Sequence, residues 1–285
     1  MTILRSSRLG YALGAVMGIA AAQLTMADDW AGYRGSRGDA TAAEAVAGGW
    51  PSGGPRLIWR VPTPAGFGSF SVAEGRVFTL VARTNEGSPA EICLALDAAT
   101  GKELWTAPVG LAKYPGGGDS GAPGNRGGDG PRSTPAVSGG KVYVYSSDMV
   151  LHCLDAATGK PVWKHDILHE YAGRNIGWKS AMSPVVDGEL VFVAGGGPGQ
   201  SLLAFNQASG AVAWKTGDEK MTHATPVVAT LHGIRQVIFL MQSGLVAVEA
   251  GRGTPLWRFP HPYRTSTACS PVVSGDVVFC TAGYE

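Results

Sequence analysis

The sequence has little charge, little cysteine and no long helical pattern. Only 16% of the 285 residues are charged and the formal net charge is +1, so the chain offers no basic stripe for nucleic acid or for an anionic membrane surface. After residue 27, no stretch keeps an apolar period of 3.6 residues for more than roughly two turns, the nearest being residues 166–172. The lack of longer helices excludes a parallel fold of alternating strands and helices.

What the chain does have is glycine, proline and apolar residues. It contains 42 glycines and 18 prolines, and 45% of its residues are hydrophobic. Glycine and proline at this level indicate many turns, while the hydrophobic content is too high for a disordered chain. The composition therefore predicts a folded, turn-rich β protein.

One phrase of eleven residues recurs four times in fixed register, at residues 95–105, 153–163, 204–214 and 247–257. In each copy an acidic or amide residue precedes a glycine by four positions, and a tryptophan follows that glycine by four. An acidic or amide side chain nucleates a turn by accepting backbone N–H groups, and glycine takes the positive φ of a tight hairpin. The tryptophan then lies at a fixed phase on a strand, where it fills the space between neighbouring sheets. The acidic or amide residues are Asp97, Asp155, Asn206 and Glu249, and the tryptophans are Trp105, Trp163, Trp214 and Trp257.

The phrase lies at the end of a longer unit that opens with a Ser/Thr-Pro pair. Each unit contains four short β-rich runs separated by turn residues, which predicts four antiparallel strands. Units of this kind repeated at roughly 40–50 residues are propeller blades, so the fold class is predicted as an all-β propeller with about four full blades and partial blades. Full blades are expected at residues 69–105, 134–163, 183–214 and 225–257, and a fifth begins at residue 270. The opening pairs are Thr134-Pro135, Ser183-Pro184, Thr225-Pro226 and Ser270-Pro271.

The first 27 residues have the pattern of a secretory signal peptide, with a basic start, an apolar core over 11–22 and a small-residue cleavage site after Ala27. The alternative is an uncleaved membrane anchor, but the apolar run is short for a span. The mature chain is therefore expected to be periplasmic or secreted, without a transmembrane segment.

The rest of the chain divides into an extended N-terminal arm at 28–55 and a propeller domain at 56–285. Within that domain, residues 57–61 resemble a lone final strand carrying Trp59. Because the fifth blade stops after its second strand, we expect the propeller to be incomplete at the C-terminus. A small closed ring of four or five blades is the alternative.

Four cysteines remain in what is expected to be an oxidising compartment. Cys153 occupies the position held by alanine in the other copies of the phrase, which predicts a small buried core residue. Cys269 and Cys280 face each other across a hairpin if Ser274 and Gly275 form its turn. A disulfide between them and two free thiols both remain open.

The repeated phrase resembles the tryptophan-docking motif of quinoprotein propellers, Ala-x-Asp-x-x-x-Gly-Lys-x-x-Trp, which residues 95–105 match throughout. Residues 28–285 are most similar to exported bacterial propellers of the pyrroloquinoline quinone (PQQ)-like kind, through the segments at 29–35, 130–135 and 227–237. The wider family includes PQQ dehydrogenases and the propeller lipoprotein of outer-membrane protein assembly. The resemblance implies a propeller of about seven or eight blades.

The resemblance also sets a test for catalysis. PQQ dehydrogenases of the family carry a vicinal Cys-Cys disulfide, a calcium held by acidic and amide ligands, and an Asp base. No two cysteines here are adjacent, and no acidic residue has a matching context. The sequence therefore favours a non-catalytic scaffold over a dehydrogenase with PQQ and calcium. An outer-membrane assembly propeller is a third hypothesis, against which the lack of a cysteine at the cleavage site counts.

The loops that precede the innermost strands are expected to face the central opening of the propeller. They carry cations and aromatics that would suit a carboxylated or aromatic ligand, or an acidic segment of a protein partner. The alternative is that these side chains are solvated or locally paired. The candidates are Arg132, Trp178, Lys179, His223, Tyr263 and Arg264.

Two further segments resemble metal sites, and neither is favoured. His165 and His169 have the spacing of a helical zinc motif, but a connector turn after a last strand explains the segment equally. The loop with Asp119, Asn125 and Asp129 has oxygen ligands for calcium but lacks EF-hand spacing. No metal is therefore predicted.

Overall fold

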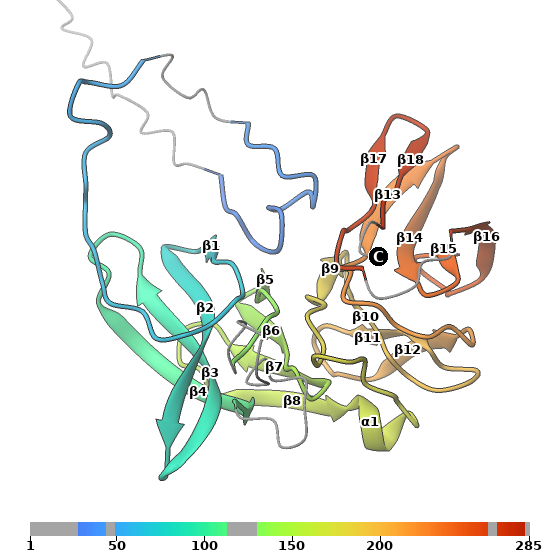
Figure 1. Ribbon diagram of the computed structural model, residues 1–285, viewed down its shortest axis with the longest axis horizontal. Helices are drawn as coiled ribbons and strands as arrows, with labels where there is room; N and C mark the ends of the chain where they lie inside the picture. Colours follow the sequence, from blue (N-terminus) through green and yellow to red (C-terminus); the bar gives the residue numbers. More distant parts are fainter. Residues whose placement is uncertain (1–27, 44–48, 113–129, 262–266, 283–285) are drawn as a thin grey trace, which may run out of the picture.

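The computed structural model describes residues 28–43, 49–112, 130–261 and 267–282. Their regular structure is almost entirely antiparallel β, in four sheets of four strands followed by a hairpin. In each sheet the strands are ordered as they occur in the chain, so short hairpin turns connect them. The propeller blades predicted from the repeat are confirmed (Figure 1).

The first two sheets contain β1 (Ser71–Ala73), β2 (Arg76–Asn85), β3 (Ser88–Asp97) and β4 (Glu103–Leu111), then β5 (Ala136–Ser138), β6 (Lys141–Tyr145), β7 (Val150–Asp155) and β8 (Pro161–Asp166). The next two contain β9 (Val185–Asp187), β10 (Leu190–Ala194), β11 (Leu202–Asn206) and β12 (Val212–Thr216), then β13 (Val227–Leu231), β14 (Ile234–Met241), β15 (Gly244–Glu249) and β16 (Pro255–Pro260). The hairpin consists of β17 (Val272–Ser274) and β18 (Val277–Phe279).

The sheets follow one another around an arc, with the first strand of each sheet on the concave side (Figure 1). These first strands approach one another in series, from β1 through β5, β9 and β13 to β17. They therefore line the central side of the propeller.

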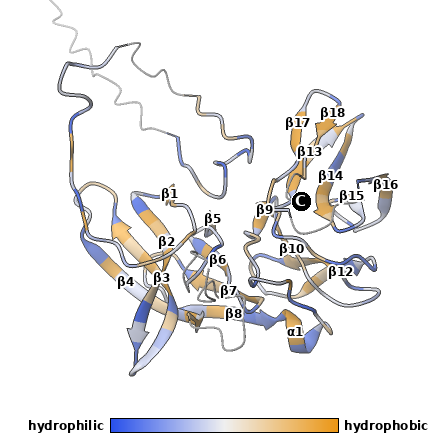
Figure 2. Ribbon diagram, viewed as in Figure 1, coloured by the Kyte–Doolittle hydropathy of each residue, from blue (hydrophilic) through white to orange (hydrophobic). Residues whose placement is uncertain are grey.

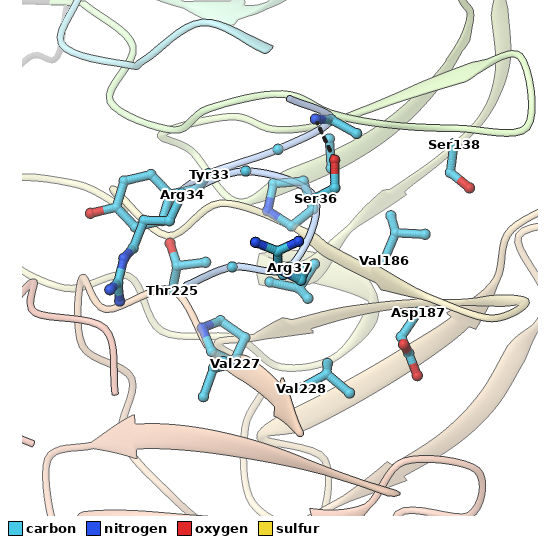
Figure 3. Close-up of a pocket in the computed structure, with 18 of the residues that line it drawn as sticks. Tyr33, Arg34, Ser36, Arg37, Ser138, Val186, Asp187, Thr225, Val227 and Val228 are labelled. Carbon is cyan, nitrogen blue, oxygen red and sulfur yellow. Dashed lines mark hydrogen bonds between the residues drawn. The ribbon is translucent and has the colours of Figure 1, made fainter. Parts of the chain in front are cut away.

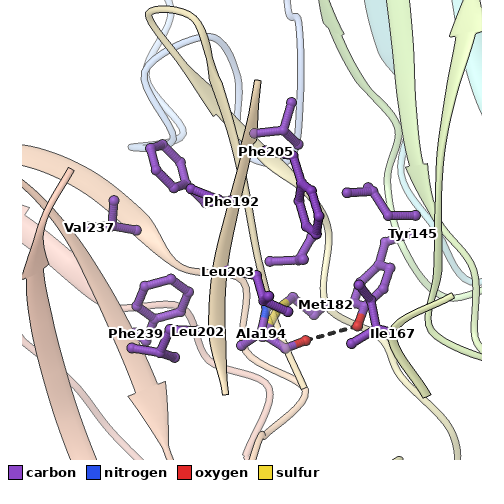
Figure 4. Packing of buried hydrophobic residues seen from close by; sticks show 14 of the residues in the cluster. Tyr145, Ile167, Met182, Phe192, Ala194, Leu202, Leu203, Phe205, Val237 and Phe239 are labelled. Atoms are coloured by element: carbon purple, nitrogen blue, oxygen red, sulfur yellow. Dashed lines mark hydrogen bonds between the residues drawn. The ribbon is translucent and has the colours of Figure 1, made fainter. Parts of the chain in front are cut away.

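Each sheet packs its two faces against its neighbours, so the middle strands are apolar on both sides. Strands β6, β10 and β14 are largely buried, whereas the outer strands β8 and β16 are largely exposed. Figure 2 shows the hydropathy of the residues along these strands. Figure 4 shows the third sheet between its neighbours, with Phe205 facing Tyr145 and Phe192 facing Val237. The buried Tyr145 hydroxyl donates to the Ala194 carbonyl at 2.9 Å. The hydroxyl is therefore hydrogen-bonded although the ring is buried in the core.

The tryptophans join consecutive blades. Each indole N–H donates to the carbonyl that follows the acidic or amide residue of the next blade. The glycine of that next turn lies beneath the ring, at a position where a Cβ would be within 2.8 Å of indole atoms. The pairs of indole, carbonyl and glycine are Trp59 with Ala98 and Gly101, Trp105 with Ala156 and Gly159, Trp163 with Gln207 and Gly210, and Trp214 with Ala250 and Gly253. Trp257 instead donates to the Gln236 side chain of its own sheet at 2.7 Å.

A β-bulge lies opposite every tryptophan of the repeat. The residue paired with the tryptophan is fully buried, and the register shifts immediately after it. Cys153 is one of these residues, which confirms its predicted role as a small core side chain, and burial raises the pKa of its thiol to about 12. The other three are Ala95, Ala204 and Ala247.

One local prediction is wrong, and the turn on which the Cys269–Cys280 pairing depended is not formed. Residues 57–61 form no strand, although Trp59 occupies the same position against the first sheet as the strand tryptophans do. In the last hairpin Ser274 pairs with Val277, so Gly275 and Asp276 form the turn. This register does not place Cys269 opposite Cys280, and both are free thiols.

Among the described residues, the one helix is α1 (Ile167–Glu170), and no helix there has the length and apolarity needed to cross a bilayer. Its N-cap is Asp166, whose side chain accepts the His169 N–H. The signal peptide predicted at 1–27 lies outside the described residues.

Candidate functional site

A belt of hydrogen bonds joins the loops that lead into the innermost strands. The Ser69 N–H donates to the Thr134 hydroxyl at 3.0 Å, and the Thr134 N–H donates to the Ser183 hydroxyl at 2.9 Å. The Ser183 N–H continues the series to the Thr225 hydroxyl at 3.0 Å. These are the Ser/Thr residues that open the blades, so each hydroxyl ties one blade to the one before it. The belt holds the loops around the central opening in fixed relation.

Side chains two residues before the belt positions form a rim at this end of the propeller. Phe67, Arg132 and His223 occupy equivalent positions in three blades, two residues before Ser69, Thr134 and Thr225. The Arg132 guanidinium lies 5.0 Å from the centre of the Phe67 ring, a cation–π contact. Phe67 is 52% exposed, so the ring also presents an apolar face to solvent.

His223 is the buried member of the rim. The residue is only 8% exposed, and burial followed by the nearby Arg132 charge lowers its pKa, while hydrogen bonding of the ring to the backbone carbonyls of Gly177 and Lys179 opposes the shift. Its backbone N–H donates to the Thr267 carbonyl at 3.0 Å. Within the described residues, its Nδ1 atom has no hydrogen-bond partner. A buried neutral imidazole with one free nitrogen is suited to exchange a hydrogen bond with a bound group.

Trp178 and Lys179 extend the rim in an unusual backbone conformation. Both are left-handed, with φ of 64° and 62°, which is costly for residues with a side chain and is often found at functional positions. The Lys179 ammonium pairs with Asp148 at 2.7 Å, and the Lys179 N–H donates to the Ile176 carbonyl. Trp178 remains 44% exposed. The strained turn thus presents an indole to solvent beside the cations of the rim.

The structure gathers four of the six predicted site residues at one end of the propeller. His223 is affected by the Arg132 charge and by the backbone of Lys179, which follows Trp178 directly. Tyr263 and Arg264 lie outside the described residues. The cationic character is weaker than the sequence suggests, because burial lowers the pKa of His223 and Lys179 is paired with Asp148.

The N-terminal arm crosses the concave side of the arc and pairs with two innermost strands (Figure 1). Trp30 and Val72 exchange hydrogen bonds of 2.7 and 2.9 Å, and the Val137 N–H donates to the Ala31 carbonyl at 2.7 Å. Between the arm and strands β5, β9 and β13 lies a cavity of about 520 Å³. Figure 3 shows residues of its walls, with Arg34 and Arg37 on the arm and Val186 and Val228 on strands β9 and β13.

The segment that resembles a zinc motif does not have the required geometry. His165 lies on β8, before the helix, and its Nε2 contacts the Gly210 carbonyl of the next blade at 2.7 Å. Its Nδ1 contacts Glu170 at 2.7 Å, while His169 contacts Asp166. The ring stacks on Phe205 at 4.5 Å. His165 is thus an inter-blade contact.

The described residues do not fit a calcium–quinone centre of the dehydrogenase type. They contain no group of three or more His, Cys, Asp or Glu side chains arranged to hold a metal. The four cysteines are free and separate in sequence, so no vicinal disulfide is available to cover a quinone. The loop with Asp119, Asn125 and Asp129 lies outside the described residues.

Two features of the site were missed by the sequence analysis. Aligning the blades on their opening residues would have found Phe67, which stands in the same position as Arg132 and His223. The cavity beneath the arm had no signal of this kind, because the arm contacts strands far from it in sequence.

Comparisons with known proteins agree with the propeller fold. A family model described as outer membrane protein assembly factor BamB matches residues 88–285. Among solved structures, the chain is similar to a europium-containing methanol dehydrogenase, with 14% identity and a TM-score of 0.49 over 68% of this chain and 41% of that chain. It is similar to quinohemoprotein alcohol dehydrogenase ADHIIG from Pseudomonas putida HK5, with 19% identity and a TM-score of 0.47 over 71% and 35% of the two chains.

A further similar structure is BamB from Moraxella catarrhalis, with 18% identity and a TM-score of 0.37 over 76% of this chain and 77% of that one. The chain spans less than half the length of either dehydrogenase. No curated protein matches it in sequence.

Proposed function

Because the chain belongs to the propeller family described as outer membrane protein assembly factor BamB, we propose that it is a non-catalytic exported scaffold that binds a protein partner through its rim. The rim is the group Phe67, Arg132, Trp178, Lys179 and His223. Tyr263 and Arg264 follow β16 in the corresponding connection and are proposed to extend it.

The observation that carries the proposal is the exposed Trp178 in a left-handed turn. A large aromatic at a costly backbone position is retained where the surrounding structure or the function requires it. Tryptophan and arginine are the residue types that most often dominate protein interfaces, and the rim combines them with Phe67. The free Nδ1 atom of His223 adds a polar contact for a partner group.

The predicted leader and the family membership support an exported location. We propose that residues 1–27 are removed as a signal peptide and that residues 28–55 act as an arm on the propeller of residues 56–285. Mass spectrometry of the protein isolated from its host tests this, since it should give an N-terminus at Asp28.

Site-specific photo-crosslinking tests the rim. A photoreactive phenylalanine analogue at position 178 should give a discrete adduct in cell-envelope extracts, and the purified partner should bind the Trp178→Ala variant about tenfold more weakly. The same analogue at Val162, an exposed position on β8, is the matched control and should give no such adduct. Equal adducts from both positions, or undiminished binding by the Trp178→Ala variant, would contradict the proposal.

The alternative is a PQQ-dependent dehydrogenase. Adding PQQ and calcium to the full chain, then measuring quinone absorbance and dye reduction with alcohols and sugars, separates the two functions. If the protein binds one equivalent of quinone and turns over substrate, the proposed scaffold function is wrong and the protein is an oxidoreductase.

A further inference from the structure

Residues 32–40 of the N-terminal arm form consecutive hydrogen-bonded turns. These turns direct Arg34 toward the central side of the propeller. Its backbone makes internal hydrogen bonds from Gly35 to Gly32, from Gly38 to Gly35 and from Ala40 to Arg34. Arg34 is left-handed at φ 63°, followed by Gly35 at φ 82°. A Cβ on Gly35 would lie 3.0 Å from the Trp30 ring, so the turn is packed closely onto that indole.

The arm is attached to blades at both sides of the cavity that it covers. Trp30 pairs with Val72 in the first sheet, and Arg34 reaches the Pro271 carbonyl before β17 at 3.5 Å. The opposite wall consists of β5, β9 and β13, the first strands of three blades. The volume of the cavity, about 520 Å³, falls within the usual range for small-molecule sites.

The charges that line the cavity are unequal. Three guanidinium groups, of Arg34, Arg37 and Arg235, and one carboxylate, of Asp187, line it. Arg235 and Asp187 form a two-pronged pair, and Arg37 pairs with Asp39 of the arm at 3.2 Å. Among the described residues, Arg34 is therefore the arginine of the lining without a carboxylate partner. An arginine fork is the side chain best suited to a carboxylate.

Hydroxyl groups make up much of the remaining polar lining, in Ser36, Ser138, Thr225 and Ser270. The Ser270 hydroxyl is buried and, within the described residues, has no hydrogen-bond partner. Ser270 opens the last blade, as Thr225 opens the blade before it. The series of hydrogen bonds between opening residues ends at Thr225 among the described residues. A buried hydroxyl without a partner is costly unless a ligand or water completes it.

From these features we infer that the cavity binds a small hydroxylated carboxylic acid of the sugar-acid class. Arg34 would hold the carboxylate, and the serine and threonine hydroxyls, that of Ser270 above all, would hold the ligand hydroxyls. This site is separate from the rim, so the inference stands apart from the proposed partner binding.

Calorimetric titration of the full chain with D-glucuronate tests the inference, with D-glucose as the ligand that lacks the carboxylate. Glucuronate should bind saturably, and glucose should bind at least about tenfold more weakly. The Arg34→Gln variant should weaken glucuronate binding by about tenfold, and the Ser270→Ala variant should weaken it by at least about threefold. The Arg83→Gln variant removes an arginine paired with Glu103 at 2.8 Å outside the cavity and is the matched control that should bind normally.

Circular dichroism and melting temperature establish that each variant is folded, and Ser270→Ala serves as the second variant because it breaks no hydrogen bond among the described residues. Absence of saturable binding overturns the inference, as does equal binding of glucose. A loss in Arg83→Gln as large as in Arg34→Gln also overturns it. Trp178→Ala should leave glucuronate binding unchanged, which separates this site from the rim.

Discussion

The indole N–H of Trp105 donates to the Ala156 carbonyl at 3.0 Å, and the same ring lies over Gly159. These two contacts join the first blade to the turn of the second. Asp155 forms that turn by accepting the Ala157 and Thr158 N–H groups. The tryptophan of one copy of the phrase therefore packs against the acidic residue's turn and the glycine of the next copy. In this case Trp105 belongs to the first blade, and Asp155 and Gly159 belong to the second.

Replacing Gly159 with alanine should destabilise the protein more than a positive φ alone explains. The new Cβ would meet the Trp105 ring at 2.5 Å. Gly75→Ala is the matched control, since Gly75 has the same φ of 71° and nothing within 4 Å of a Cβ. We expect a cost of about 1–2 kcal/mol for the control and about 1–3 kcal/mol more for Gly159→Ala, measured by urea unfolding. Equal losses would show that the indole contact is not tight.

The acidic residue of the turn should be replaceable by asparagine but not by alanine. Asn206 stands at this position in the third blade and accepts the Ala208 and Ser209 N–H groups, as Asp155 does in the second. We therefore expect Asp155→Asn to keep the melting temperature and Asp155→Ala to lower it. A drop in Asp155→Asn as large as that in the alanine variant would mean that the charge, and not the hydrogen bonds, stabilises the turn.

The belt predicts a loss of stability when a hydroxyl acceptor is removed. Ser183 and Thr134 are 1% and 2% exposed, so Ser183→Ala leaves the Thr134 N–H buried without a partner, at a cost of about 1–3 kcal/mol. Ser270→Ala removes a hydroxyl that has no partner among the described residues, so it breaks no hydrogen bond there and should not lower stability. Chemical denaturation of both variants measures the difference. If both variants lose the same free energy of unfolding, the hydrogen bonds of the belt are not the cause of the lower stability.

Stability should fall between pH 6.5 and pH 4 because of His152. Burial, followed by the Lys164 charge, lowers the pKa of this ring from 6.5 to about 4, while its hydrogen bond to the Val109 carbonyl opposes the shift. In this window the unfolded chain binds the proton and the folded chain does not, so stability is full above the unfolded value and is lost as the pH falls. The loss is of order 2–3 kcal/mol.

His152→Gln should flatten this dependence, measured as unfolding free energy at pH 7 and pH 5. His223 also has a lowered pKa, so a smaller slope should remain. An unaltered slope in His152→Gln would assign the pH dependence to other groups.

The sequence by itself determined the blades, because the features that define them are local. The turn of Asp155 and Gly159 depends on hydrogen bonds within a few residues and on one positive φ, and the period of the phrase places Trp163 on the following strand. Cys153 was likewise assigned to the core by its position in the repeat.

Only the tertiary structure decided what these units contact. Trp59 joins the first blade without a strand, the arm reaches the concave side, and Phe67 meets Arg132 across a blade boundary. The register of the last hairpin depends on its turn, and a small change there separates Cys269 from Cys280. Such contacts join residues that are distant in the chain, and no local pattern records which distant partner a side chain will have.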